Sequence, residues 1–336
     1  MKTVTILPSK HSFTIETNET VLDAALRQGY SLSYGCRNGA CGSCVSKLIS
    51  GKVEYPNGQP AALDDNTLGQ SATVLCQAIA VTDITIEAHE IAAIKDIPVK
   101  TLPCRVALIE HLSHDVIEMR LKLPVTERLQ FLAGQYLDFL LKDGRRRSFS
   151  IANTPHNDEY IELHIRHIQD GQFTGRVFGE IEEKDILRIE GPKGSFYIRE
   201  SSNRPSIMMA GGTGIAPIKS MVEYSLAANL ENHIHIYWGA ESLRDLYLHE
   251  QWLKLVEQYE HIEYTAVLNN PKSEDSWTGR TGYVHLAVIE DYPDLSEHDL
   301  YGSGPPVMVY AGRDSFPGNG LDLKNYYSDA FEFQRD

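Results

Sequence analysis

Residues 36–44 run Cys36-Arg37-Asn38-Gly39-Ala40-Cys41-Gly42-Ser43-Cys44, and a fourth cysteine follows after a long gap. The order Cys-x4-Cys-x2-Cys and then a distant cysteine is typical of proteins that hold a 2Fe-2S cluster. Glycines at positions 35, 39 and 42 let the backbone wrap closely around a cluster and turn amide N–H groups toward its negatively charged sulfurs. The stretch predicts an electron-carrying domain whose iron ligands are Cys36, Cys41, Cys44 and Cys76.

Two other interpretations of these cysteines fit the spacing less well. Four-cysteine zinc sites usually pair two short Cys-x2-Cys knuckles, whereas one crowded loop supplies three cysteines here. A thioredoxin-like redox motif at residues 41–44 requires that no further cysteine lies close by, and Cys36 is just upstream. The fifth cysteine, Cys104, is left without a partner, so we expect an ordinary half-buried thiol and assign it no function.

The composition bounds the class of protein. A chain of 336 residues with 42% hydrophobic residues predicts two or three domains with sizeable cores. The sequence has no run of eighteen apolar residues, and its first residues are too polar for a signal peptide, so we expect a cytoplasmic protein without membrane insertion. The formal net charge of -15 excludes nucleic acid as a default partner.

The first 91 residues predict a β-grasp ferredoxin domain. Residues 1–17 alternate apolar and polar side chains, as a hairpin does. Thr20 is a helix N-cap and Gly29 a helix end. Residues 79–86 predict a strand that returns after Cys76, and residues 92–102, with mixed polarity, predict a linker.

Two further domains follow. Short β-rich runs separated by turns predict an antiparallel six-stranded β-barrel over 103–202. Apolar strands alternating with helical stretches predict a parallel α/β nucleotide-binding domain over 203–336. The fold class is therefore multidomain, α+β and α/β.

Residues 145–150, Arg-Arg-Arg-Ser-Phe-Ser, fit a flavin nucleotide. The guanidinium of Arg147 suits a pyrophosphate, the ring of Phe149 can lie against the isoalloxazine, and the Ser150 hydroxyl can reach the N5 edge of the flavin. A helix N-terminus at Thr174, preceded by Gly171, would add backbone donors for the phosphates. Three arginines taken alone are more often a solvated turn, but the ordered pair of motifs favours the flavin.

Residues 208–217, Met-Met-Ala-Gly-Gly-Thr-Gly-Ile-Ala-Pro, are a buried strand followed by a glycine turn and a helix. This arrangement places a dinucleotide pyrophosphate on a helix N-terminus. Pro217 stands where the usual fingerprint has its third glycine, and proline is well tolerated in a first helical turn. A glycine turn by itself is as often structural, but its position after a flavin motif favours a nicotinamide site.

The whole chain resembles the ferredoxin-NADP reductase superfamily in its three-part form, with a plant-type ferredoxin ahead of flavin and nicotinamide domains. It is similar to reductase components of bacterial aromatic-ring and methane oxygenases. Residues 146–153, 210–217 and 327–331 most resemble CDP-6-deoxy-glucoseen reductases, which pass electrons to a sugar dehydrase.

This resemblance implies three cofactors, 2Fe-2S, FAD and NADH, with NADPH possible. The residues implied to bind FAD are Arg147, Phe149, Ser150, Ile165, Arg166, Gly171, Phe173 and Thr174. Those implied to bind the nicotinamide nucleotide are Gly211, Gly212, Thr213, Gly214, Ala216, Pro217, Gly304 and Pro305. We assign the catalytic roles to Ser150, Thr213 and Ser303.

The C-terminal region carries two further expectations. The resemblance implies that C-terminal aromatics shield the flavin, and we choose Phe331, with a tail anchor as the alternative. Many relatives have Cys-Gly near the nicotinamide where this chain has Ser303 and Gly304. The thiol's contribution to hydride transfer is then missing, and Ser303 would only partly replace it.

Glu241 indicates the preferred nicotinamide cofactor. The residue after the strand that ends near 240 normally faces the adenosine ribose, where a carboxylate accepts from a 2'-hydroxyl and repels a 2'-phosphate. NADH is favoured on this ground, while Ser242 and Arg244 leave NADPH open.

The three motifs together predict an electron-transfer enzyme. Nicotinamide gives two electrons as hydride and a 2Fe-2S cluster takes one at a time, so a flavin must stand between them. We expect the acceptor to be a protein, an oxygenase component or a nucleotide-sugar dehydrase. A free-flavin reductase and a non-catalytic redox sensor are the alternatives. The sequence does not identify the acceptor or the oligomeric state.

Overall fold

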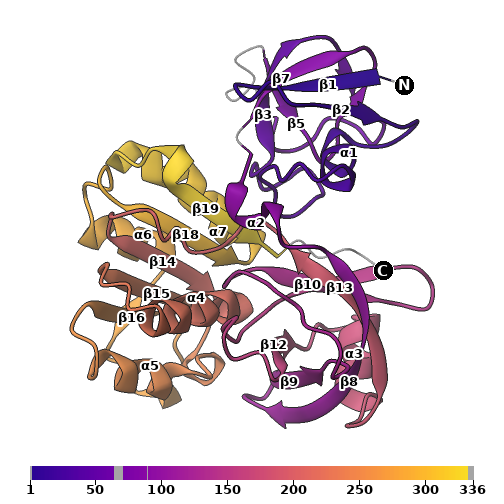
Figure 1. Ribbon diagram of the computed structural model, residues 1–336. Coiled ribbons are helices and arrows are strands. Elements are labelled where there is room, and N and C mark those ends of the chain that lie inside the picture. The colour runs from indigo at the N-terminus through magenta and orange to yellow at the C-terminus, as the bar shows by residue number, and fades with distance from the viewer. Residues whose placement is uncertain (1, 64–70, 89, 332–336) are drawn as a thin grey trace. The chain divides into compact units, whose positions relative to one another are not determined.

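The computed structural model describes residues 2–63, 71–88 and 90–331. The chain forms two compact units (Figure 1). The N-terminal unit contains residues 1–98 and the short segment Gly194–Phe196, and the larger unit contains residues 99–193 and 197–336.

The N-terminal unit is built on a five-stranded sheet in the order β2-β1-β7-β3-β5. Strands β4 and β6 form a separate pair. Parallel pairing of β1 with β7, next to the antiparallel β1–β2 hairpin, agrees with the predicted β-grasp domain. Its elements are β1 (Lys2–Leu7), β2 (Ser12–Ile15), α1 (Val21–Arg27), β3 (Val45–Ser50), β4 (Val53–Glu54), β5 (Ala72–Val74), β6 (Ile79–Ala80), β7 (Ile84–Glu87) and α2 (Ala92–Lys95).

The predicted cap of α1 is confirmed, and one predicted strand is wrong. The Thr20 hydroxyl accepts from the backbone N–H of Asp23 at 3.1 Å, and Gly29 follows the helix with a φ of 82°. Residues 79–86, predicted as one strand, form β6 and β7, because a turn at 81–83 sends the chain from one sheet to the other.

Six antiparallel strands form the first half of the larger unit, in the order β11-β10-β13-β8-β9-β12. A bridge between Ile151 and Leu163 joins the two end strands, which agrees with the predicted barrel. Strand β8 already begins at Lys100, so the residues predicted as a linker contain the helix α2 and the start of a barrel strand. The elements are β8 (Lys100–His111), β9 (Val116–Lys122), β10 (Tyr136–Leu140), β11 (Arg146–Ser150), β12 (Ile161–Arg166), α3 (Gln172–Gly179) and β13 (Ile186–Lys193).

A six-stranded parallel sheet, β17-β16-β15-β14-β18-β19, forms the second half. Helices α4 and α5 cover one face and α6 and α7 the other (Figure 1). Every residue of β14 and β18 is buried, as expected for central strands covered on both faces. The elements are β14 (Ser206–Gly211), α4 (Ile215–Ala227), β15 (Ile234–Ala240), α5 (His249–Val256), β16 (Ile262–Leu268), β17 (Arg280–Thr281), α6 (Val284–Asp291), β18 (Asp299–Gly304), α7 (Pro306–Ser315) and β19 (Tyr326–Ala330).

The strand order reverses between β14 and β18. From β14 the chain moves outward through β15, β16 and β17, and then it returns to β18 on the other side. Ligands of open α/β sheets bind at the carboxyl ends of the strands on either side of such a reversal. Within the described residues of this second half there are also five short 3-10 turns: Gly212–Gly214, Leu243–Asp245, Ser273–Asp275, Phe316–Asn319 and Leu323–Asn325.

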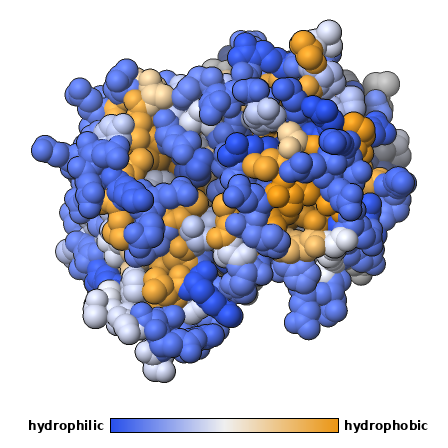
Figure 2. Space-filling view, turned by 90° about the horizontal axis from the view of Figure 1, so that it is seen from below, coloured by the Kyte–Doolittle hydropathy of each residue, from blue (hydrophilic) through white to orange (hydrophobic). Residues whose placement is uncertain are grey.

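The surface shown in Figure 2 is mainly hydrophilic, with several separate hydrophobic patches. None of the helices within the described ranges combines the length and the hydropathy that a membrane span needs.

Candidate electron-transfer sites

The cluster loop, residues 35–44, brings its backbone amides to its own sulfurs. The amide of Cys41 donates to Sγ of Cys36 at 3.3 Å, and the amide of Cys36 donates to Sγ of Cys41 at 3.5 Å. Gly39 has a φ of 85°, and a Cβ there would lie 2.9 Å from atoms of Gln77 and Pro60. Only glycine therefore fits this position.

The four predicted ligands form two pairs. In one pair a hydrogen bond from Cys36 lowers the pKa of the Cys41 thiol to about 6, and the pKa of Cys36 rises. In the other pair a hydrogen bond from Cys44 lowers the pKa of Cys76, and the pKa of Cys44 rises. Three of the four side chains are buried and Cys36 is partly exposed.

This pairing fits a 2Fe-2S cluster better than zinc. In a cluster each iron takes two cysteine sulfurs, whereas a zinc ion needs all four sulfurs around one point. Across the described part of the chain, no three cysteine sulfurs lie within 4.8 Å of one another. Cys104 is more buried than predicted, at 2% exposed, and burial raises the pKa of its thiol to about 12.

The three arginines before the flavin motif have different surroundings. Arg145 pairs with Asp143 and Arg146 pairs with Glu190, as in an ordinary charged turn. Arg147, the residue predicted to meet the pyrophosphate, is partly exposed and donates to the carbonyl of Arg146 at 2.8 Å.

The ring of Phe149 is partly exposed and rests on two other aromatic rings. Its centroid lies 5.7 Å from those of Phe139 and Phe173, both of which are in the barrel core. Phe173 and Ile165, predicted to bind FAD, are 3% and 0% exposed, so only their main chains are placed to contact a ligand. Phe149 keeps an accessible surface against which an isoalloxazine ring can lie.

The predicted phosphate helix begins two residues earlier than expected, at Gln172. The Thr174 hydroxyl accepts from the amide of Ile168 at 3.1 Å, and it therefore holds the turn that leads into the helix. A Cβ at Gly171 would lie 2.6 Å from that hydroxyl oxygen, so the turn requires glycine. The N-terminus of α3 therefore follows Gly171, as the predicted phosphate site requires.

The glycine loop, residues 211–217, lies at the carboxyl end of β14, where the strand order reverses. A Cβ at Gly214 would lie 2.1 Å from the carbonyl oxygen of Ser303, and one at Gly304 would lie 2.5 Å from the carbonyl oxygen of Gly211. Two backbone segments thus pack against each other through glycines. Within the glycine loop, Thr213 is the only residue that is not buried, which fits its predicted place beside a ligand.

Ser303 is placed differently from the expectation. Its side chain is 0% exposed, and its hydroxyl donates to the carbonyl of Gly214. In this geometry Ser303 holds the two glycine segments together, and a contact between its hydroxyl and the nicotinamide ring is not favoured.

The flavin strand meets the nicotinamide sheet at Asp329, a residue that the sequence analysis did not single out. The hydroxyl of Ser150, at the end of β11, donates to the carboxylate of Asp329 on β19 at 3.4 Å. Two residues further on, the amide of Phe331 donates to the carbonyl of Gly304 at 2.8 Å. Ser150, Gly304 and Phe331 are thereby brought to one edge of the sheet.

Glu241, predicted to face the adenosine ribose, follows directly after β15 and is exposed. Pro305 is exposed just beyond β18, while Ala216 and Pro217 are buried in the first turn of α4. The residues predicted to bind the dinucleotide therefore gather at the carboxyl edge of the sheet, and Gly212 lies against the guanidinium of Arg166.

Three family profiles match consecutive parts of the chain. The 2Fe-2S iron-sulfur cluster binding domain matches residues 4–81, the oxidoreductase FAD-binding domain residues 103–198, and the oxidoreductase NAD-binding domain residues 208–314.

Relatives match over nearly the whole length. The CDP-6-deoxy-L-threo-D-glycero-4-hexulose-3-dehydrase reductase of Yersinia pestis is 39% identical over 98% of both chains. Reductase component 1 of the terephthalate 1,2-dioxygenase of a Comamonas species is 33% identical over 95% of this chain and 94% of its own. The crystal structure of an Amycolatopsis cytochrome P450 reductase has a TM-score of 0.79 at 26% identity, over 98% of this chain and 99% of that chain.

Fold, site and these matches define an NAD(P)H-dependent iron-sulfur flavoprotein oxidoreductase. The chain belongs to the three-domain reductases of the ferredoxin-NADP reductase superfamily. It carries electrons from the nicotinamide cofactor through FAD to the 2Fe-2S cluster and on to a partner.

Proposed function

We propose that this reductase takes its electrons from NADH and delivers them singly to a nucleotide-sugar dehydrase. The transfer from the nicotinamide cofactor to the flavin is supported by the hydrogen bond between Ser150 and Asp329. This bond brings the flavin strand to the carboxyl edge of the nicotinamide sheet. Bound FAD would supply the conversion of a hydride into two single electrons.

The choice of acceptor rests on the relatives. The dehydrase reductase of Yersinia pestis is 39% identical, against 33% for the dioxygenase reductase of Comamonas. Both relatives span nearly the whole chain, so the two identities are compared over almost the same residues.

The proposed roles of the site residues follow from their positions. Ser150 and Asp329 hold the flavin edge at which hydride arrives, and Thr213 contacts the nicotinamide nucleotide from the exposed side of the glycine loop. Phe331, linked through its amide to Gly304, would cover the flavin until the nicotinamide ring displaces it.

The preference for NADH is assigned to Glu241, whose exposed carboxylate repels a 2'-phosphate. We expect Glu241→Ser to improve use of NADPH relative to NADH by about tenfold, because the variant loses about 1.4 kcal/mol of charge repulsion against the 2'-phosphate. Steady-state kcat/KM values for the two cofactors measure this ratio. A ratio equal to that of the wild type would place the specificity elsewhere.

The acceptor is tested with the reconstituted holo-protein and NADH. It is mixed with a CDP-6-deoxy-hexulose 3-dehydrase and its sugar substrate, or with a Rieske-type dioxygenase and its aromatic substrate. We expect product from the dehydrase and little from the oxygenase. Turnover with the oxygenase alone would contradict the proposed acceptor, and release of reduced free flavin at the full rate would favour a free-flavin reductase.

A further inference from the structure

Strand β12 has one apolar face and one polar face, and both are covered. Ile161, Leu163 and Ile165 belong to the barrel core. The alternate residues Glu162, His164 and Arg166 lie on the opposite face, where an isolated barrel would meet water. The side chain of His164 is nevertheless only 1% exposed and that of Glu162 only 14%.

Helix α4 covers the first of these polar residues. Nζ of Lys219 lies 3.2 Å from the carboxylate of Glu162 and 3.3 Å from the carbonyl oxygen of Ala152. The next residue, Ser220, donates its hydroxyl to the carbonyl of Asn153 at 2.6 Å. Helix α4 is therefore attached to the backbone that directly follows the flavin strand β11, one turn after the glycine loop.

His164 connects the same strand to the glycine loop by a second route. Its Nε2 lies 3.0 Å from Glu162, and its Nδ1 lies 3.1 Å from the phenol oxygen of Tyr247. The ring of Tyr247 packs edge-on against that of Trp238 at 5.2 Å between centroids. The indole N–H of Trp238 donates to the carbonyl of Gly212 at 2.9 Å.

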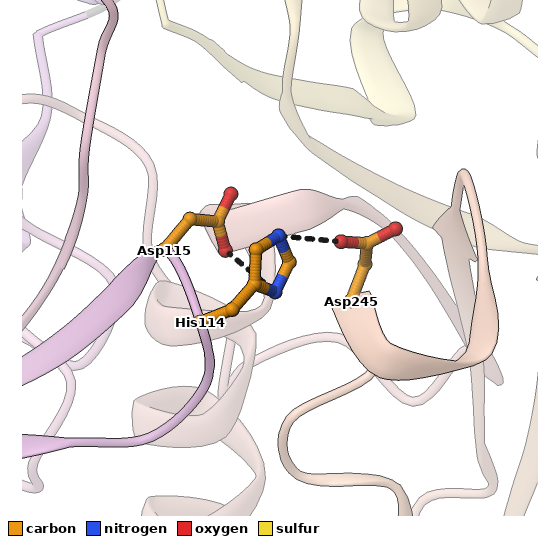
Figure 3. Close-up of side chains that lie close together, drawn as sticks. All are labelled: His114, Asp115 and Asp245. Atoms are coloured by element: carbon orange, nitrogen blue, oxygen red, sulfur yellow. Dashed lines mark ion pairs between the residues drawn. The ribbon is translucent and has the colours of Figure 1, made fainter.

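A third contact lies at the other end of β12. His114, in the turn between β8 and β9, stands between Asp115 and Asp245 (Figure 3). Its Nδ1 lies 3.7 Å from a carboxylate oxygen of Asp115, and its Nε2 lies 3.7 Å from one of Asp245. Nε of Arg166 lies 3.1 Å from the carboxylate of Asp115. Because a guanidinium already lies against Asp115, we interpret this group as an ion-pair network rather than a metal site.

Charge makes the contact between Glu162 and Lys219 specific. Burial alone would raise the pKa of the carboxyl, but the hydrogen bond from His164 and the charge of Lys219 outweigh it and lower the pKa to about 2. Burial lowers the pKa of Lys219, and Glu162 and Glu223 together raise it further than that. Both partners are charged, so removal of one leaves the other buried with a weaker set of partners: Glu162 would keep His164, and Lys219 would keep Glu223.

We propose that Glu162, His164 and Lys219, here called the β12 clamp, are positioning residues that hold the glycine loop in register with the flavin strand for hydride transfer. The inference rests on the proposed transfer from NADH to FAD. The reacting atoms must approach to within about 3.5 Å, and a displacement of about 1 Å by a remote substitution can slow a reaction about 100-fold.

The test compares Lys219→Met, Glu162→Gln and the double variant in the holo-protein. Anaerobic rapid mixing with saturating NADH gives the limiting rate of flavin reduction. Hydrogen exchange of the amides of residues 212–218 gives a readout independent of activity. We expect the limiting rate of Lys219→Met to fall about 10- to 100-fold, with bound FAD unchanged and faster exchange at 212–218. Lys219→Arg should keep most of the rate.

Two comparisons separate positioning from stability. Lys122→Met removes the lysine that ends β9 and pairs with the exposed Glu159 in the same unit, and it should change neither readout. The double variant leaves no unpaired buried charge, so it should regain thermal stability while flavin reduction stays slow.

Three results decide the matter. A limiting rate for Lys219→Met within about twofold of the wild type would overturn the clamp, as would unchanged exchange at 212–218. If the double variant recovered both the full rate of flavin reduction and its thermal stability, Glu162 and Lys219 would have a structural role only. A wild-type holo-protein whose flavin NADH does not reduce would instead refute the proposed function.

Discussion

The cluster loop and the glycine loop are both short and glycine-rich, but they build their sites in different ways. The cluster loop supplies three of four ligands from nine consecutive residues, and its amides face its own sulfurs. The glycine loop contributes mainly backbone, and its site is completed by β11, β12, β18 and β19. A site made of local side chains can be read from spacing, whereas a site made by packing depends on residues far along the chain.

Loss of one cluster ligand should give the largest effect. We expect Cys41→Ser to abolish electron delivery to the acceptor while NADH still reduces the flavin, because the ligand pairs lie only in the N-terminal unit. Cytochrome c reduction and flavin bleaching measure the two steps. Cys104→Ala is the matched control, since this cysteine pairs with no other, and it should leave both steps near the wild-type rate. If Cys41→Ser reduced cytochrome c at the wild-type rate, the cluster would not lie on the path of the electrons.

A methyl group in the glycine loop should act on the opposite step. Gly214→Ala would place a Cβ 2.1 Å from the carbonyl oxygen of Ser303, which forces the two backbone segments apart. We expect flavin reduction by NADH to fall about 100-fold, with dithionite reduction of the cluster unaffected. Gly318→Ala, where a Cβ meets nothing within 4 Å, is the control. Flavin reduction by Gly214→Ala at the wild-type rate would mean that this close packing does not matter.

The contact between the flavin strand and β19 should have an intermediate effect. Ser150→Ala and Asp329→Asn each remove part of the same hydrogen bond. We expect each to slow flavin reduction about 10- to 100-fold, and the double variant to be no slower than the worse single variant. The pre-steady-state rate and the isotope effect with NADH deuterated at C4 measure this. Additive losses would show that the two residues act separately.

The last prediction, with the smallest expected effect, concerns how the stability deficit of Glu162→Gln changes with pH. The pKa of Glu162 is about 2 in the folded protein, against an ordinary value of 4.5, so its stabilisation is complete above pH 4.5 and is lost as the pH falls toward 2. This carboxylate should contribute on the order of 3 kcal/mol at neutral pH. The deficit of Glu162→Gln should therefore shrink between pH 4.5 and 2.

Urea unfolding followed by tryptophan fluorescence tests this expectation. All three tryptophans, Trp238, Trp252 and Trp277, belong to the larger unit, so the signal reports the unit that contains Glu162. A deficit that stays constant down to pH 2 would contradict the charged state assigned to this carboxyl.

Much of the fold could be predicted from the sequence because its signals are local. The cysteine spacing, the cap at Thr20 and the strand-glycine-helix order at 208–217 each depend on neighbouring residues. The single strand expected at 79–86 was wrong, because its β propensity does not show that a turn divides it between two sheets.

The site was predicted less completely where it depends on tertiary contacts. Asp329 and Ser150 are 179 residues apart, and Lys219 meets Glu162 only because α4 packs on β12. No residue spacing in the sequence predicts either contact. Ser303 is a different case. Its catalytic role was predicted from the resemblance, because relatives have Cys-Gly where this chain has Ser303 and Gly304, but its hydroxyl donates to the carbonyl of Gly214.

One measurement tests the central claim, that electrons pass from NADH through FAD to the cluster. The holo-protein is mixed with NADH without oxygen, and the flavin absorbance and the paramagnetic signal of the reduced cluster are followed together. The account predicts that the flavin bleaches first and the cluster signal follows, and that Cys41→Ser keeps the first phase and loses the second. A cluster signal that arises equally fast in protein stripped of FAD would contradict it.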